Sequence, residues 1–347
     1  MSGQSHGEIS ELDESSTRYG RGDRLISPDF HPRILAPELE RTIVHLATTI
    51  GVRHIWLRDR LEAAADWIDS EFRSFGFPPA TREKFVARDV PVENLWVEVP
   101  GSTRPDEIIV IGSHYDSRCG MATKKGRIPD PSRPGTPGAN DNASGVAATV
   151  ALARLFQDRL LAGKTPERTL RFVAFVNEEP PFFQTAEMGS WVHARGCRAR
   201  GEKIVGMFTP ETLGYYTDEP GTQKLASLFG RGGAATGDFV AFLCDWSSRK
   251  FLDAMLRHFR ARTGFPVVGL PVPKLLKRVA WSDDWGFWQE GYPGVTVTDT
   301  AFLRYREYHT PEDTPEKLVY PRMAQVVAAL GGMLDDLDRD PTISTGG

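Results

Sequence analysis

The 347-residue sequence has few cysteines, no strong charge of either sign and no long apolar run. Its three cysteines, Cys119, Cys197 and Cys244, form no CxxC pair and cannot all pair internally, which is typical of a reducing compartment. The formal net charge is −4 and Lys and Arg form no stripe, so nucleic acid is not an expected partner. The apolar stretches are of strand length, far below the roughly 20 residues of a membrane span, so no membrane segment is expected.

The N-terminal segment 1–30 is polar and acidic and contains no apolar block that resembles a secretory signal. We therefore predict a polar tail at 1–30 and a cytoplasmic location. The remainder, 31–347, shows no internal repeat and no convincing linker, which predicts a single domain. The proline-rich stretch 129–138 is interpreted as a stiff loop at the rim of a site, because it lies between two candidate functional residues.

The hydrophobic pattern alternates between strand and helix periods. Helices are predicted from Pro37 onward and at 57–75, 143–158, 187–200, 250–262 and 321–337. Strands are predicted at 82–87, 94–99, 107–111, 170–176, 203–207 and 295–298. The order strand, helix, strand favours βαβ units, hence an α/β fold with a mixed, largely parallel sheet whose ligands bind beyond the carboxyl ends of the strands.

Five dispersed residues are candidate metal ligands. They are His114 in Gly-Ser-His-Tyr-Asp, Asp141 in Ala-Asn-Asp-Asn, Glu179 in Val-Asn-Glu-Glu, Glu211 in Thr-Pro-Glu-Thr and His309 in Tyr-His-Thr. Two imidazoles and three carboxylates can hold two zinc ions, which accept nitrogen and oxygen ligands and can share one bridging carboxylate. Such a site is hydrolytic, so the pattern indicates an enzyme.

Ordinary structural roles remain open for several of these residues. In an extended segment Asp116 points the same way as His114 and can orient its imidazole, but a His-x-Asp pair is also common at a plain surface turn. Asp141 directly precedes a predicted helix, where an N-cap is the alternative role, although Asn142 or Ser144 can supply that cap.

Glu178 and Glu179 follow a buried strand, where two adjacent carboxylates repel each other unless a cation is close. One of them can ligate zinc while the other transfers the proton of the attacking water to the leaving amine. An exposed strand end with two solvated charges is the alternative. His309 lies in a turn before the last helix, and the adjacent Tyr308 is either an oxyanion donor or a packed aromatic residue.

Four sequence blocks together resemble the di-zinc exopeptidases, the family of bacterial aminopeptidases, glutamate carboxypeptidases and glutaminyl cyclases. The blocks are Gly-Ser-His-Tyr-Asp-Ser, Pro-Gly-Ala-Asn-Asp-Asn-Ala-Ser-Gly-Val, Phe-Val-Asn-Glu-Glu and Tyr-His-Thr-Pro-Glu-Asp-Thr, and the likeness extends from Leu39 to Leu337. The resemblance implies a phosphorylase/hydrolase-like three-layer α/β/α fold and a zinc-peptidase catalytic domain over 31–347.

The resemblance also implies a role for each matched residue. Its metal set is His114, Glu211, Glu179 and His309, with Asp141 as the bridge between two zinc ions. It implies that Glu178 is the general base, that Asp116 orients His114 and that Tyr308 is a candidate oxyanion donor. A cis peptide between Asp141 and Asn142 is a further expectation from the family.

The sequence departs from the family pattern at two places. Glu211 stands where many relatives have aspartate, and its extra methylene leaves open a weaker or different ligation of the second metal. Ser282-Asp283-Asp284-Trp285 stands where relatives have Ser-Asp-His. The two acids beside aromatic residues favour a cationic group such as a substrate α-amine, and solvated surface acids are the alternative.

The resemblance favours an aminopeptidase acting on peptides or amino-acid amides. A glutaminyl cyclase with one zinc, a carboxypeptidase or amidase, and a metal-free binding module on the same fold are the alternatives. A carboxypeptidase needs a cationic clamp for a carboxylate, for which Arg278, Arg304 and Arg306 are candidates. The sequence does not decide the preferred side chain, the oligomeric state or whether zinc, cobalt or manganese is bound.

Overall fold

The apolar runs of the chain pair into one mixed sheet of eight strands in this computed structural model, which describes residues 31–120, 135–225, 227, 235–272 and 282–343. The predicted tail 1–30 and most of the proline-rich stretch 129–138 lie outside these residues. The strands are β1 (Thr81–Ala87), β2 (Val90–Val99), β3 (Arg104–His114), β4 (Arg168–Phe175), β5 (Lys203–Glu211), β6 (Val240–Cys244), β7 (Val267–Pro271) and β8 (Gly294–Thr298).

The strand order is β1-β2-β4-β3-β5-β8-β6-β7. The four central strands β4, β3, β5 and β8 run parallel, whereas β1, β2 and β6 introduce antiparallel pairs. The unit β3, α3 (Ser144–Leu161), β4 is the predicted βαβ unit, because β3 and β4 are parallel neighbours. The predicted mixed, largely parallel sheet is confirmed.

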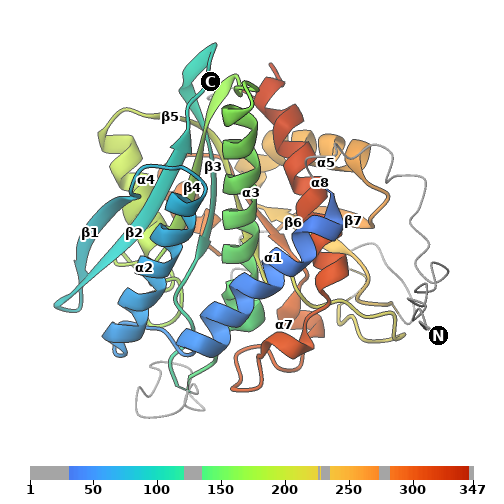
Figure 1. Ribbon diagram of the computed structural model, residues 1–347. Coiled ribbons are helices and arrows are strands. Elements are labelled where there is room, and N and C mark those ends of the chain that lie inside the picture. Colours follow the sequence, from blue (N-terminus) through green and yellow to red (C-terminus); the bar gives the residue numbers. More distant parts are fainter. Residues whose placement is uncertain (1–30, 121–134, 226, 228–234, 273–281, 344–347) are drawn as a thin grey trace, which may run out of the picture.

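Helices cover both faces of the sheet (Figure 1). One layer holds α1 (Pro32–Val44), α2 (Arg58–Ser74), α3, α5 (Arg249–Arg262) and α8 (Tyr320–Arg339), which pack on one another and on the strands. The other layer holds α4 (Gly189–Ala199) and α6 (Asp284–Gln289). Along β3, Ile109 and Ile111 join the core on the first face and Ile108 and Val110 join the core on the second. The strand is apolar throughout because both of its faces are buried.

The first helix begins earlier than predicted. It starts at Pro32 rather than at Pro37, which lies inside it, and a π-helical segment His45–Ile50 extends it. A proline inside a helix removes one hydrogen bond, so a sequence reading places the boundary there. Burial of Leu35 and Leu39 on the same face, against α3 and α8, offsets that loss.

Two strands and two short helices were not predicted. The strands β6 and β7 have five residues each, and β7 contains both glycine and proline. The helices α6 and α7 (Ala301–Arg304) have six and four residues. Elements this short have no measurable period, and the two strands form here because β6 pairs with β8 and β7 pairs with β6.

Candidate metal centre

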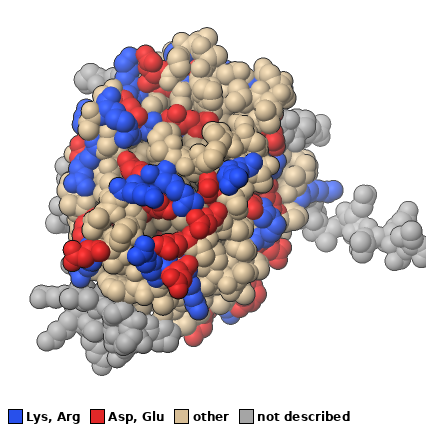
Figure 2. Space-filling model, turned by 60° about the vertical axis from the view of Figure 1, so that its left-hand side comes forward, with Lys and Arg blue, Asp and Glu red and all other residues tan. Residues whose placement is uncertain are grey.

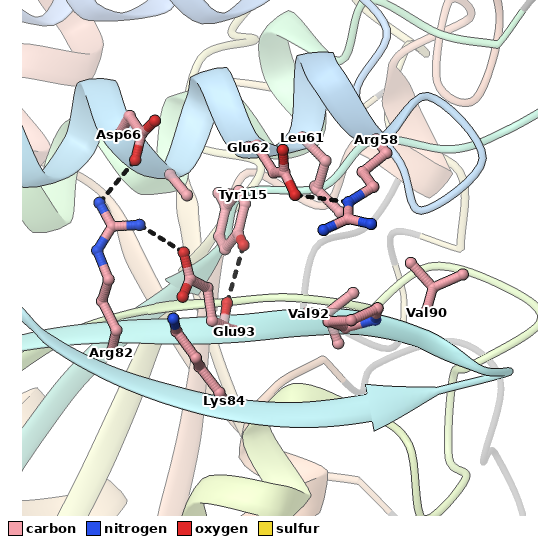
Figure 3. A pocket seen from close by; sticks show the side chains of 12 residues that line it. Arg58, Leu61, Glu62, Asp66, Arg82, Lys84, Val90, Val92, Glu93 and Tyr115 are labelled. Carbon is pink, nitrogen blue, oxygen red and sulfur yellow. Dashed lines mark hydrogen bonds and ion pairs between the residues drawn. The ribbon is translucent and has the colours of Figure 1, made fainter.

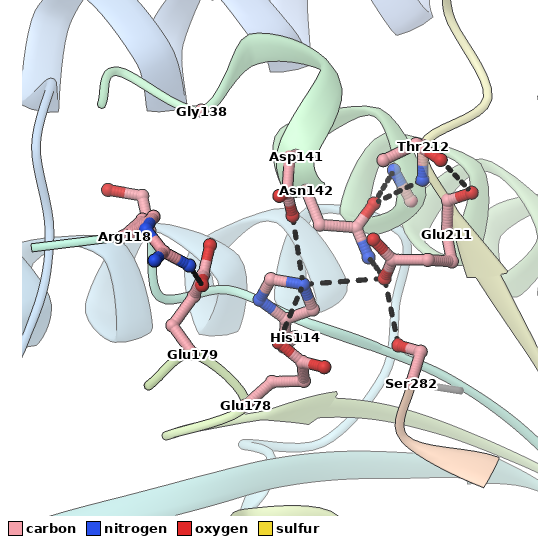
Figure 4. Close-up of polar contacts among 12 residues, drawn as sticks. His114, Arg118, Gly138, Asp141, Asn142, Glu178, Glu179, Glu211, Thr212 and Ser282 are labelled. Atoms are coloured by element: carbon pink, nitrogen blue, oxygen red, sulfur yellow. Dashed lines mark hydrogen bonds and ion pairs between the residues drawn. The ribbon is translucent and has the colours of Figure 1, made fainter. Parts of the chain in front are cut away.

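His114 is the last residue of β3, and its imidazole is fully buried. The Nδ1 atom lies 3.1 Å from the backbone oxygen of Asp116 and 3.5 Å from Oδ1 of the same residue. The Nε2 atom lies 3.3 Å from Asp141 Oδ1 and 3.3 Å from Glu211 Oε2 (Figure 4). No described residue forms a hydrogen bond with Nε2, although this nitrogen is buried.

Asp141 lies in the turn that leads into α3, and the peptide bond between Asp141 and Asn142 is cis, as expected. The carboxylate of Asp313 holds this turn by accepting hydrogen bonds from the backbone nitrogens of Asn140 and Asp141, at 2.9 and 3.1 Å. The two oxygens of Asp141 face different histidines. Oδ1 faces His114, and Oδ2 lies 2.8 Å from Nε2 of His309.

Glu178 and Glu179 follow β4, and both are buried. The carboxylate of Asp116 accepts hydrogen bonds from both of their backbone nitrogens, each at 3.2 Å. Asp116 therefore fixes this pair of residues in addition to lying beside His114. Glu178 Oε2 is 3.8 Å from His114 Nε2, so its carboxylate borders the same space. The predicted alternative of two solvated charges is wrong, because β4 and its neighbours enclose them.

The two oxygens of the Glu179 carboxylate have different neighbours. Oε1 lies 3.5 Å from His309 Nε2, is buried and has no hydrogen-bond partner among the described residues. Oε2 lies 3.5 Å from the guanidinium of Arg118 (Figure 4). Arg118 was not singled out in the sequence, although its place four residues after His114 puts it on the same loop.

Glu211 is the last residue of β5, not a residue beyond it, and its side chain points toward His114 (Figure 4). Its Oε2 accepts a hydrogen bond of 2.7 Å from the Asn142 amide and one of 2.9 Å from the Ser282 hydroxyl. Asn142 also accepts a hydrogen bond from the backbone nitrogen of Gly145, so it provides the cap that was left open between Asp141 and its neighbours.

His309 differs from His114 because it lies in a loop, with a positive φ of 61° and a side chain that is 26% exposed. Its ring stacks on the ring of Tyr308, with centroids 3.8 Å apart. No described residue forms a hydrogen bond with the Tyr308 hydroxyl, and burial raises the pKa of this phenol well above its ordinary value. Tyr308 is thus packed and also keeps a free donor.

The carboxylates of this cluster are crowded and shielded from water. Burial raises the pKa of Glu178 well above its ordinary value and the pKa of Glu179 to about 7. Burial lowers the pKa of His114, but the charges of Glu211 and Glu178 outweigh burial and raise that pKa well above its ordinary value. A bound cation would relieve this repulsion, because it favours the ionised form of every carboxylate near it.

The residues present fit two metal ions. His114, Asp141 and Glu211 form one group of three potential ligands, and Asp141, Glu179 and His309 form another, with the ligand atoms of each group within 4.8 Å of one another. Imidazole nitrogen and carboxylate oxygen are zinc donors, and Asp141 belongs to both groups. Buried atoms without a hydrogen-bond partner, His114 Nε2 and Glu179 Oε1, contribute to these groups.

Asp283 and Asp284 are both fully buried, so the alternative of solvated surface acids is wrong. Asp284 Oδ1 accepts a hydrogen bond from the backbone nitrogen of Ser282, which is a local structural role. Neither carboxyl oxygen of Asp283 has a hydrogen-bond partner among the described residues. Burial raises the pKa of Asp283 well above its ordinary value. The charge of His114 lowers this pKa and the charge of Glu211 raises it, so Asp283 interacts electrostatically with the candidate metal centre.

Arg304 is not a clamp for a substrate carboxylate. Its guanidinium is buried and donates to the side chain of Gln223 and to the backbone oxygens of Gly237 and Phe239. Arg306 is exposed, and Arg278 lies outside the described residues.

Arg53 is a supporting residue that the sequence did not reveal. Its buried guanidinium donates to the backbone oxygens of Tyr115, Pro137 and Gly138, at 2.6, 2.5 and 3.1 Å. It thereby ties the loop after His114 to the loop before Asp141. A lone arginine before an aromatic segment carries no sequence signal for this role, because its partners are carbonyl groups that every residue has.

A separate hollow of about 240 Å³ lies between α2 and the β1–β2 hairpin (Figure 3). Arg82 pairs there with Asp66 and Glu93, and Arg58 pairs with Glu62. Its charges therefore largely satisfy one another. The face in Figure 2 likewise shows Lys and Arg interspersed with Asp and Glu, without an extended patch of one sign.

Other sequence expectations concern the thiols and the membrane. The three cysteines are free thiols and are buried. No helix within the described residues is long and apolar enough to cross a membrane.

Comparisons with known proteins identify a similar family, similar sequences and similar folds. The model of peptidase family M28 matches residues 94–332. The uncharacterized protein YfbL of Escherichia coli (strain K12) is 32% identical over 307 residues, which cover 85% of this chain and 87% of that protein. The structure of the LapA aminopeptidase of Legionella pneumophila superimposes with a TM-score of 0.65 at 15% identity, covering 97% of this chain and 78% of that one.

The glutaminyl cyclase of Porphyromonas gingivalis superimposes with a TM-score of 0.62 at 16% identity, covering 90% of this chain and 99% of that one. At such identities the likeness to the two solved structures establishes the three-layer α/β/α fold and nothing finer.

Proposed function

Because this chain belongs to peptidase family M28 and is a metallopeptidase, we propose that it is an aminopeptidase that removes N-terminal residues from peptides with two zinc ions. The observation that carries the proposal is the position of Asp141. Its two carboxylate oxygens face two different histidines, His114 and His309. That geometry supports one carboxylate shared between two metals, which is the arrangement of two-metal hydrolases.

In this proposal each metal has its own ligands besides the shared one. His114 and Glu211 complete the group around one zinc, and Glu179 and His309 complete the group around the other. When bound, the zinc ions lower the pKa of water and polarise the carbonyl of the scissile bond.

Glu178 is the proposed general base. It belongs to neither ligand group, and its Oε2 lies 3.8 Å from His114 Nε2, at the edge of the metal site. Burial raises the pKa of the Glu178 carboxylate well above its ordinary value, which makes it a stronger proton acceptor than a solvated glutamate. Glu178 takes one proton from the attacking water as the oxygen of that water bonds to the carbonyl carbon. It then gives that proton to the amine nitrogen as the C–N bond breaks.

Asp116, Tyr308 and Asp283 have supporting roles in this proposal. Asp116 orients His114 and holds the backbone of the two glutamates through its carboxylate. The Tyr308 hydroxyl donates a hydrogen bond to the oxyanion that develops on the carbonyl oxygen. Asp283, whose carboxyl oxygens have no hydrogen-bond partner among the described residues, is the candidate that accepts a hydrogen bond from the substrate amine.

A glutaminyl cyclase is the second candidate, and Glu211 is the residue that favours considering it. Oε2 of Glu211 already accepts hydrogen bonds from Asn142 and Ser282. A cyclase that uses one zinc ion is therefore the alternative to hydrolysis with two. In a cyclase the α-amine of the substrate attacks its own side-chain amide, and ammonia leaves.

The experiment that separates the two candidates is metal content per chain combined with product analysis. Freshly purified protein is assayed by elemental analysis, and aminoacyl-anilides and glutaminyl peptides are supplied before and after chelation. Two zinc ions and chelator-sensitive release of the anilide support the aminopeptidase. One zinc, no anilide release and cyclised glutaminyl product would replace it with the cyclase. No metal after zinc is added back would refute both.

A further inference from the structure

Two donors converge on a single oxygen of Glu211 from distant parts of the chain. The amide nitrogen of Asn142, next to the shared Asp141, donates to Oε2 at 2.7 Å. The hydroxyl of Ser282, just before α6, donates to the same oxygen at 2.9 Å (Figure 4). No described residue forms a hydrogen bond with the other oxygen, Oε1, so the carboxylate is held on one side only.

Both donors are themselves fixed in place. The side-chain oxygen of Asn142 accepts hydrogen bonds from the backbone nitrogens of Gly145 and Thr212, at 2.9 and 3.1 Å. Ser282 is 2% exposed, and its backbone nitrogen donates to Asp284 at 3.0 Å. The Asn142 side chain cannot swing away from Glu211 without breaking these two hydrogen bonds, and the backbone of Ser282 is fixed in a buried position.

We propose that Asn142 and Ser282 are positioning residues that hold the long Glu211 side chain as a ligand for the metal that it shares with His114. Glutamate has one more rotatable bond than aspartate and loses more conformational freedom when it is fixed. Two hydrogen bonds onto Oε2 restrict that freedom before the metal binds. Because Oε2 is also the oxygen that lies 3.3 Å from His114 Nε2, the two donors fix the carboxylate on the side that faces this histidine.

This proposal rests on the proposed two-zinc function. It implies that different residues support the binding of the two metals. The group of Glu179 and His309 has no contact with Ser282 in the described residues, and its carboxylate lies against Arg118 instead. Loss of the Ser282 hydroxyl is therefore expected to weaken one metal and leave the other unchanged. Partners that orient a metal ligand typically contribute about 10–100-fold in affinity.

The test is a zinc titration of the full-length apo-protein against a chromogenic chelator, which yields the dissociation constant of each bound ion. The Ser282→Ala variant is expected to bind one zinc about 10–100-fold more weakly and the other as in the wild type. Ser248→Ala is the matched control. That buried serine also donates to a carboxylate, Asp245 Oδ1 at 2.8 Å, but belongs to neither metal group.

A double-mutant cycle separates positioning from a general structural role. In a Glu211→Asp background the shorter carboxylate no longer needs the support of Ser282. Adding Ser282→Ala to that background is expected to change zinc affinity little. The same loss in both backgrounds, equal weakening of both zinc ions or no weakening would each overturn the proposal. Thermal unfolding of every variant checks that the fold is retained.

The result also separates this proposal from the function on which it rests. If the wild type binds only one zinc, the two-zinc aminopeptidase fails. Weakening of that single zinc by Ser282→Ala then still supports the positioning role, whereas an unchanged affinity overturns it.

Discussion

The two halves of the candidate metal centre are built from different kinds of structure. His114 and Glu211 are the last residues of two neighbouring parallel strands, and the His114 side chain is fully buried. Glu179 and His309 come from loops, and the His309 side chain is 26% exposed. His114 is paired with Phe175 of β4 and Glu211 with Thr298 of β8, whereas loops open at lower free-energy cost.

The supports of the two halves differ as well. Glu211 is held by the neutral donors Asn142 and Ser282, both of which are buried. Glu179 lies against the charged guanidinium of Arg118, and His309 is held by stacking on Tyr308. We therefore expect the strand-borne half to bind its metal more tightly and the loop-borne half to exchange its metal first. Asp141 is the element that the two halves share.

Replacing the shared residue, Asp141, should impair both halves of the candidate metal centre. Asp141→Asn keeps the shape of the side chain but removes the charge that faces both histidines. We expect loss of both metals and a fall in kcat/KM beyond the roughly 10²–10⁴-fold that a single proton-transfer group contributes. Elemental analysis and anilide hydrolysis measure the two effects. Retention of one tightly bound zinc would show that Asp141 is not shared.

Removing the proposed base should stop chemistry without touching either half. Glu178→Gln is expected to lower kcat by about 10²–10⁴-fold while the metal content stays the same, because Glu178 belongs to neither ligand group. The assay compares kcat with zinc content in the same sample. Loss of zinc in this variant would instead make Glu178 a ligand.

A substitution of Arg118 tests the support of the loop-borne half, as Ser282→Ala tests the support of the strand-borne half. Arg118→Met retains much of the side-chain volume but removes the cation that lies 3.5 Å from Glu179 Oε2. The zinc of the loop-borne half is expected to bind about 10-fold more weakly, and the zinc of the strand-borne half should not change. The same chelator titration measures both constants. If Arg118→Met weakens the zinc that responds to Ser282→Ala, the two supports are not separate.

The sequence was most informative where the fold places residues by a regular rule. Parallel strands end at one edge of a sheet, so the order of strand and ligand predicted that His114 and the pair Glu178 and Glu179 would share one crevice. His114 and Glu179 do lie beside Asp141. The family resemblance supplied what periodicity lacks, including the cis peptide after Asp141. Long periodic helices were found within a few residues of their ends, except where Pro37 hid the start of α1.

The supporting contacts could not be predicted, because they depend on tertiary proximity. Ser282 is 71 positions from Glu211, and nothing in its neighbourhood announces a hydrogen bond to that carboxylate. Arg53 binds backbone carbonyl groups up to 85 positions away, which leave no mark on the sequence. The burial of Asp283 likewise follows from the packing of α6 on the sheet, so the sequence left open whether the two adjacent acids line a pocket or are solvated.

The smallest expected effect is a difference between the two halves in the number of protons released when zinc binds. In the apo-protein burial lowers the pKa of His114, but the nearby carboxylates raise it well above its ordinary value, which favours the protonated imidazole. Zinc requires the neutral imidazole, and binding in the strand-borne half must therefore release the proton of His114. Affinity for that zinc should rise with pH until His114 deprotonates on its own.

Calorimetry in buffers of different ionisation enthalpy counts the protons released by each zinc. Since Ser282→Ala weakens only the zinc beside His114, that variant identifies which of the two binding steps carries this proton. Zinc binding without release of a proton, or release that belongs to the step unaffected by Ser282→Ala, would contradict the assignment of His114 to the strand-borne metal.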